Sequence, residues 1–135
     1  IERSTHLPHA DLINLGNAIF WEANPDTLDF IYISTSVEKI LGYSVEEWLQ
    51  EPMFWANHIH PEEREEKIAF CKHASTLAQD HEFEYRFLKA DGSVVWIKNI
   101  VSVQMVDGKP HLLRGIMTDI TEQRQMEQSL KDSER

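Results

Sequence analysis

The chain has 135 residues, which fits one domain with a single hydrophobic core, and its 41% hydrophobic residues exclude a disordered chain. The net charge of -10 argues against a nucleic-acid partner, because binding to phosphates requires clustered Lys and Arg. A single cysteine, Cys71, excludes a disulfide framework and favours a reducing, cytoplasmic location.

Residues 1–13 carry little pattern, and we expect a linker or a cap there. Two short strands are predicted next, at 17–23 and 29–34, joined by a turn at "NPDT" whose Asn, Pro and Asp favour a reversal of the chain.

The sequence starts and stops abruptly and has no secretory signal, so we expect a segment of a larger protein. No apolar run reaches the roughly 18 to 20 residues of a membrane span, and a membrane anchor elsewhere in the parent protein stays open.

A helical segment is predicted after the second strand. In "STSVEKILGYS" the apolar residues fall at helical spacing, and Gly42 suits the left-handed residue that ends a helix. Ser44 with Glu47 three residues later forms a capping box, and Tyr43 and Trp48 occupy the staple positions around it. A second short helix is therefore expected to begin at Ser44.

The longest predicted helix covers "HPEEREEKIAFCKHASTLAQ", residues 60–79. Pro61 fits the first helical position, and the glutamates that follow lie toward the positive end of the helix dipole. Cys71 shares an apolar face with neighbours at helical spacing, so we interpret it as a small core residue.

Three further strands are predicted at 81–89, 94–105 and 110–120, separated by the turns "ADGS" and "VDGK". In the middle strand one face is almost wholly apolar and is assigned to the core, with Asn99 as its single polar member. Two strands, a helical middle, three strands and a last helix predict an α+β fold: a five-stranded antiparallel sheet with helices on one face.

The stretch from "FEYRFLKADGSVVW" to "GIMTDITEQRQMEQSL" strongly resembles the C-terminal half of a PAS sensor domain, the PAC motif. Its "EYR", "DGS" and "W" elements and the closing "DIT" carry the resemblance, together with the earlier "ILGYSVEEWL" and "HPEER". The resemblance implies a PAS/PAC sensor domain at 14–120 and the start of a C-terminal signalling helix at 121–135. It also implies a role inside a multidomain protein with a histidine kinase or diguanylate cyclase as the output domain.

The closing "DIT", Asp119, Ile120 and Thr121, is predicted to relay a signal from the last strand to the terminal helix. Asp119 or Thr121 is expected to cap that helix, with Glu122 completing a capping box around Asp119. A shift of the last strand then becomes a rotation, bending or fraying of the helix.

The terminal helix has few apolar residues, and a helix of this kind is marginal alone in water. We expect Met126 and Leu130 to pair with a partner chain in a parallel coiled coil, which predicts a homodimer. The alternative is that both residues fold back on their own sheet. On the outer sheet face, Trp96 and Ile100 are expected to be covered by the N-terminal segment or by a second subunit.

Cofactor binding is open from the sequence. Relatives that form a covalent flavin adduct carry a cysteine just before the long helix, where this chain reads "FWANHIHPEER", so that chemistry is not expected, while non-covalent flavin stays open. Haem-binding relatives use a histidine on the long helix, and His73 lies late in it beside Lys72, so we interpret it as a surface residue. "HIHPEE" is interpreted as the structural entry to that helix, with a hydrogen bond of His60 fixing the turn, and no metal site or catalytic set is predicted.

A small-molecule ligand in the core is the remaining question. Asn99 on an apolar face needs a hydrogen-bonding partner, which is either backbone, water or a ligand. The predicted pocket lining is Phe20 or Trp21, Ile31 or Ile33, Ile40, Leu41, Phe54, Trp55, Phe70, Tyr85, Asn99 and Met117. The predicted function is a sensory and dimerisation module that regulates an output domain in the same chain; the alternative is a ligand-free scaffold for protein interaction.

Overall fold

A computed structural model describes residues 18–133, and the expected linker or cap at 1–13 lies outside them. Ten helices and strands follow one another in the described part of the chain. In chain order they are β1 (Ala18–Ala23), β2 (Phe30–Ile33), α2 (Ser36–Ile40), α3 (Val45–Gln50), α4 (Phe54–His58), α5 (Arg64–Thr76), β3 (His81–Leu88), β4 (Val94–Val106), β5 (Lys109–Asp119) and α6 (Thr121–Ser133).

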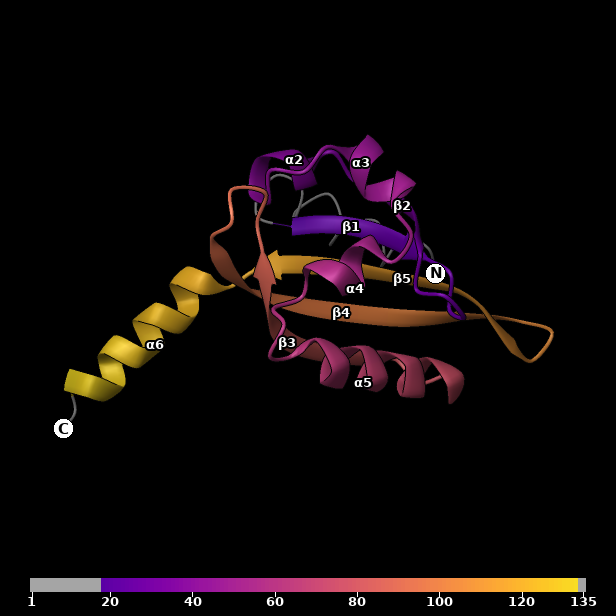
Figure 1. The fold of residues 1–135 in the computed structure, drawn as a ribbon. Coiled ribbons are helices and arrows are strands. Elements are labelled where there is room, and N and C mark those ends of the chain that lie inside the picture. The colour runs from indigo at the N-terminus through magenta and orange to yellow at the C-terminus, as the bar shows by residue number, and fades with distance from the viewer. Residues whose placement is uncertain (1–17, 134–135) are drawn as a thin grey trace, which may run out of the picture.

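The five strands form one antiparallel sheet in the order β2-β1-β5-β4-β3. The last three strands are neighbours because the short turns between them form hairpins. The last strand, β5, lies at the centre of the sheet, where it also pairs with β1 from the start of the described chain. Figure 1 shows α4 and α5 over one face, α2 and α3 beside the β1–β2 end, and α6 projecting away from the body. The predicted α+β fold with a five-stranded antiparallel sheet is confirmed.

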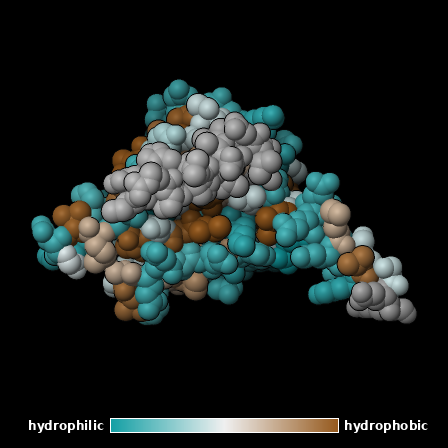
Figure 2. Space-filling view, turned by 180° about the vertical axis from the view of Figure 1, so that it is seen from behind, coloured by the Kyte–Doolittle hydropathy of each residue, from teal (hydrophilic) through white to brown (hydrophobic). Residues whose placement is uncertain are grey.

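The core lies between the sheet and helices α2 to α5. Along β4 the buried residues alternate with more exposed ones, and the side assigned to the core is the buried one, Asn99 included. On the opposite side of β4, Ile100 is 42% exposed. Figure 2 views the molecule from behind and shows apolar side chains over this outer region of the sheet.

The predicted capping box of α3 is confirmed. The Glu47 N–H donates to the Ser44 hydroxyl at 3.1 Å, and the Ser44 N–H donates to the Glu47 carboxylate at 2.8 Å. Gly42 adopts a φ of 87° after α2, as expected for a residue that ends a helix. Helix α4, between α3 and α5, has no cap side chain and was not predicted as a separate element.

The predicted start of the long helix at Pro61 is wrong, since α5 begins at Arg64. Residues 60–63 form a turn instead, in which the Glu63 N–H donates to the His60 carbonyl at 2.9 Å and the Glu62 N–H donates to His60 Nδ1 at 3.1 Å. The predicted hydrogen bond of His60 in this turn is thereby confirmed. None of the helices described between residues 18 and 133 combines the length and the apolar composition that crossing a membrane requires.

Candidate functional site

A buried polar network crosses the core above the sheet. The Trp21 indole N–H donates to Asn99 Oδ1 at 3.0 Å, and Asn99 Nδ2 donates to the Tyr85 hydroxyl at 3.1 Å. The same hydroxyl accepts from the Trp55 indole N–H at 2.8 Å and donates to Met117 Sδ at 3.6 Å. The partners of Asn99 are therefore two side chains of its own chain. The expected partners were the backbone, water or a ligand, so this arrangement was not predicted.

Burial raises the pKa of the Tyr85 hydroxyl above its ordinary value, because ionisation inside this core would leave a phenolate without water. Tyr85 therefore stays a neutral donor and acceptor throughout the physiological range. A neutral, internally satisfied network stabilises one arrangement of the core, since each member that loses its partner leaves a buried polar group unpaired.

Only part of the predicted pocket lining surrounds the small cavity beside this network. Trp55, Asn99 and Trp21, the predicted alternative to Phe20, line it. Tyr85 and Met117 join through the hydrogen bonds above. The lining residues are Trp21, Ala23, Leu28, Phe30, Trp55, Cys71, Asn99 and Leu113. Ile33 and Leu41 are fully buried in the core cluster and lie outside this lining.

Two residues predicted to line the pocket, Phe20 and Phe70, lie elsewhere, and these two predictions are wrong. Phe20 lies between Ile19 and Trp21, which belong to the core cluster, so strand alternation places Phe20 on the outer face of the sheet. Phe70 precedes the buried Cys71 on α5 and is 43% exposed, with its ring 5.1 Å from that of Phe83. The choice of Trp21 over Phe20 could not be made from four consecutive apolar residues in β1.

The cavity is too small for a flavin or a haem. Its volume is about 10 Å³, the space of about one water molecule, whereas pockets for drug-sized ligands measure roughly 300–1,000 Å³. The rings of Trp21, Phe30 and Trp55 stand around this space. The residues of the core therefore do not fit a flavin or a haem in this arrangement. Within residues 18–133, no three His, Cys, Asp or Glu side chains gather to hold a metal ion.

The predicted relay residues lie together at the junction of β5 and α6. The Ile120 N–H donates to the Trp96 carbonyl at 2.9 Å, and the Trp96 N–H donates to the Thr121 hydroxyl at 2.8 Å. The carboxylate of Asp119 accepts from the Thr121 N–H at 2.9 Å. Asp119 therefore accepts from the first residue of α6, and the predicted capping box with Glu122 is not formed. The Thr121 hydroxyl does not cap the helix but joins it to the backbone of β4.

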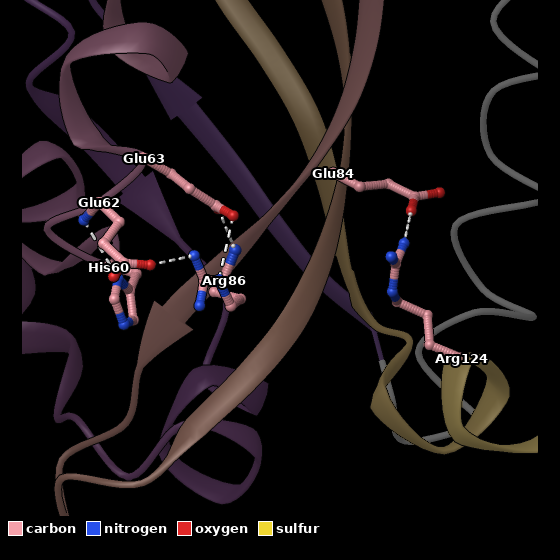
Figure 3. Close-up of polar contacts among 6 residues, drawn as sticks. All are labelled: His60, Glu62, Glu63, Glu84, Arg86 and Arg124. Carbon is pink, nitrogen blue, oxygen red and sulfur yellow. Dashed lines mark hydrogen bonds and ion pairs between the residues drawn. The ribbon is translucent and has the colours of Figure 1, made fainter. Parts of the chain in front are cut away.

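Arg124, in the first turn of α6, holds the helix against the sheet. Its guanidinium carbon lies 3.7 Å from the centre of the Trp96 ring, and its Nη1 lies 2.6 Å from Glu84 Oε1 on β3 (Figure 3). Arg86, on the same strand as Glu84, lies 5.9 Å from the Trp96 ring and pairs with Glu63 and Glu62. We call Glu84, Trp96 and Arg124 the α6 clamp; its charged members were not among the predicted site residues.

Beyond its first turn α6 has no buried residue. Met126 is 66% exposed and Leu130 is 64% exposed, which excludes the alternative that they fold back on their own sheet. At about 100° per residue, Met126 and Leu130 lie roughly 160° and 120° around the helix from Arg124. Because Arg124 faces Trp96, the two apolar side chains point away from the body. Of the four predicted dimer contacts, Trp96 is already covered in part by Arg124 of its own chain.

Comparison with known proteins agrees with this architecture. A family model described as the PAS fold matches residues 30–117. The N-terminal domain of a diguanylate cyclase with PAS/PAC sensor from Marinobacter aquaeolei is 38% identical, covers 79% of this chain and 98% of its own, and has a TM-score of 0.73. A sensory box histidine kinase/response regulator from Burkholderia thailandensis is 27% identical, with coverages of 90% and 91% and a TM-score of 0.71.

A domain of a histidine kinase from Haloarcula marismortui is 26% identical, with coverages of 84% and 98% and a TM-score of 0.69. No curated protein matches the sequence. The family match extends over well over half of the chain, from the start of β2 to residue 117 near the end of β5, and it includes every member of the core network except Trp21 on β1. The chain therefore belongs to the PAS family, whose domains are regulatory and not catalytic.

Proposed function

We propose that this domain is a relay and dimerisation module that regulates an output domain in the same chain. The observation that supports the proposal best is the geometry of α6, which leaves the sheet at Thr121, is held only near its first turn and carries exposed Met126 and Leu130 away from the body. A lever of this form transmits movement of the sheet to whatever follows it.

A second copy of this chain is the partner that we assign to the apolar face of α6. Met126 and Leu130 are four residues apart, the spacing of neighbouring core positions in a coiled coil. A helix of 13 residues with no buried side chain is marginal on its own, so pairing with an identical helix would supply the missing burial. Parallel pairing would bring two copies of the output domain side by side.

The function proposed here does not require a cofactor of flavin or haem size, and the core cavity has room for about one water molecule only. The ligand-free form of the module is therefore the one that the geometry favours. Native mass spectrometry of the purified domain checks this point: we expect the mass of the polypeptide alone, in a dimer, and a bound metabolite would contradict the ligand-free form.

Analytical ultracentrifugation tests the dimer. We expect the unmodified chain to sediment as a dimer and the double variant Met126→Gln, Leu130→Gln to sediment as a monomer with an unchanged circular dichroism spectrum. Gln128→Ala, on the side of α6 that faces the body, is the control and should stay dimeric. A monomeric parent chain, or a double variant that remains dimeric, would contradict the pairing through α6.

The regulatory role is tested by exchange of domains. This chain is fused to the N-terminal side of the kinase portion of the Burkholderia thailandensis protein, where it replaces the matching domain, and autophosphorylation is measured. We expect the pair Asp119→Ala and Thr121→Ala to change the rate, because both hold the junction, while Glu66→Gln on α5 should not. An unchanged rate in the junction variant would remove the basis of the relay.

A further inference from the structure

The turn that precedes α5 is joined to the edge strand β3 by a two-point contact. Glu63 accepts from Arg86 twice, with the backbone N–H at 2.8 Å from Oε1 and Nε at 3.0 Å from Oε2, and both side chains are partly buried. Glu62 adds a third bond, at 2.9 Å from Arg86 Nη2. One guanidinium is therefore held by two carboxylates, as Figure 3 shows.

The same turn also pairs with the backbone of β3. The His60 N–H donates to the Arg86 carbonyl at 2.9 Å, and Ile59 forms an isolated antiparallel bridge with Phe87. Movement of the turn therefore moves Arg86 directly, at a point where the strand would otherwise present a free edge.

Arg86 lies on the same face of the sheet as the two groups that hold Arg124. Arg86 is directly opposite Trp96 in the β3–β4 register, and Glu84 lies two residues before it, on the same face of β3. The Trp96 ring and the Glu84 carboxylate are the groups that hold Arg124. As long as Glu62 and Glu63 hold Arg86, both groups remain available to Arg124.

We propose that Arg86 and Arg124 compete for Glu84 and Trp96, and that the grip of Glu63 on Arg86 thereby sets the direction of α6. Arg124 is a positioning residue for the helix, and the 60–63 turn is the place from which its position is controlled. This inference rests on the proposed role of α6 as a lever and adds the route by which a change beside α5 reaches it.

The physical argument is one of charge and reach. A guanidinium that loses its two carboxylate partners forms hydrogen bonds with other acceptors within reach. For Arg86, Glu84 is the carboxylate two residues before it on the same face of β3. Two cations beside one indole and one carboxylate repel each other, so occupation by Arg86 weakens the hold on Arg124. Loss of that hold leaves α6 tied only at Ile120 and Thr121, about which it can swing.

Distance measurement between two spin labels tests this route. Labels are attached to cysteines introduced at Lys72 on α5 and Glu127 on α6, both exposed. The native Cys71 is buried, so we expect it to stay unlabelled. The labelled chain is diluted into an excess of unlabelled chain, so that only distances within one chain are recorded. The parent should give one narrow distribution, and Arg124→Gln should broaden and shift it.

The decisive variant is Glu63→Gln, which removes a charge that has no contact with α6. We expect it to broaden the α5–α6 distribution as Arg124→Gln does, whereas Glu66→Gln, the same change one turn further along α5, should leave the distribution unaltered. In the double variant Glu63→Gln, Arg86→Gln the competitor is gone, and the narrow distribution should return.

Each remaining result decides against part of the proposal. An unaltered distribution in Arg124→Gln would overturn the positioning role of Arg124. A broadened distribution that persists in Glu63→Gln, Arg86→Gln would overturn the competition. Thermal unfolding by circular dichroism shows that each variant is folded, and sedimentation of the same samples reports the dimer separately, so failure of the route is distinguishable from failure of the lever.

Discussion

The indole of Trp21 on β1 reaches across β5 to bond Asn99 on β4, a residue 78 positions later in the chain. It passes over Gly115, which is the direct neighbour of Trp21 in the β1–β5 register. A Cβ atom at Gly115 would lie 2.5 Å from Trp21 Cε2, so the absence of a side chain there makes the crossing possible. Three strands are thereby joined through one side chain and one glycine.

Replacement of Asn99 by Leu should destabilise the domain by about 2 kcal/mol, because the Trp21 indole N–H would remain buried without an acceptor. Urea unfolding followed by circular dichroism measures the loss. Ser102→Ala, on the outer side of the same strand, is the control and should change the free energy of unfolding by less than about 0.5 kcal/mol. Equal stability of Asn99→Leu and the parent would show that the network does not stabilise the fold.

Gly115→Ala should cost at least about 2 kcal/mol of stability, since the added methyl group collides with Trp21 and with the Ile100 carbonyl at 2.6 Å. The collision with the indole predicts non-additivity in a double-mutant cycle. Trp21→Phe removes the colliding ring, so Gly115→Ala should cost less in that background than in the parent. The same urea unfolding measurements give all four corners of the cycle, and additive costs would contradict the contact.

The sequence predicted the strands and the inward face of β4 because their signals are local. Alternation along β4 identifies the buried side, and the Asp-Gly turns locate the hairpins. The same reasoning fails for β1, where "AIFW" has no alternation and does not decide whether Phe20 or Trp21 faces the pocket. The partners of Asn99 depend on the register of three strands, which no local pattern contains.

The residues of the β5–α6 junction could be identified from the sequence, but their hydrogen bonds could not. Asp119 was expected to cap α6 and does bind its first turn, whereas the bond from Trp96 to Thr121 depends on how β4 and β5 pair. The direction of α6 likewise follows from Arg124, whose partners Glu84 and Trp96 lie on two other strands. Helical periodicity predicts that α6 exists but does not predict its direction relative to the sheet.

Thr121→Val should loosen the junction with little effect on the rest of the domain. The substitution keeps the shape of the side chain and removes the acceptor of the Trp96 N–H, a loss of about 1 kcal/mol at this partly buried site. Hydrogen exchange measures it directly, because the Trp96 amide should exchange about fivefold faster or more, at about 1.4 kcal/mol per factor of ten. Ser133→Ala near the end of α6 is the control and should leave this exchange rate unchanged. Unchanged protection of the Trp96 amide in Thr121→Val would contradict the hydrogen bond between Trp96 and Thr121.

Cys71 should make the domain less stable in alkali. Burial raises the pKa of its thiol from 9.0 to about 11, so the folded state keeps its proton while the unfolded state loses it. The stabilisation is complete below pH 9 and is lost as the pH rises toward 11, by up to about 2 to 3 kcal/mol at about 1.4 kcal/mol per pKa unit. Urea unfolding across this range should give a steeper decline for the parent than for Cys71→Ala.

Tyr43 contributes to the alkaline decline in both proteins, since burial raises its pKa to about 12, and its effect cancels in the comparison of parent and variant. Cys71→Ser is the matched control, because a hydroxyl of similar size does not ionise in this range. It should share the shallower decline of Cys71→Ala even where its stability near neutral pH differs. Parallel declines in the parent and both variants would mean that the thiol ionises as readily in the folded chain as in the unfolded one.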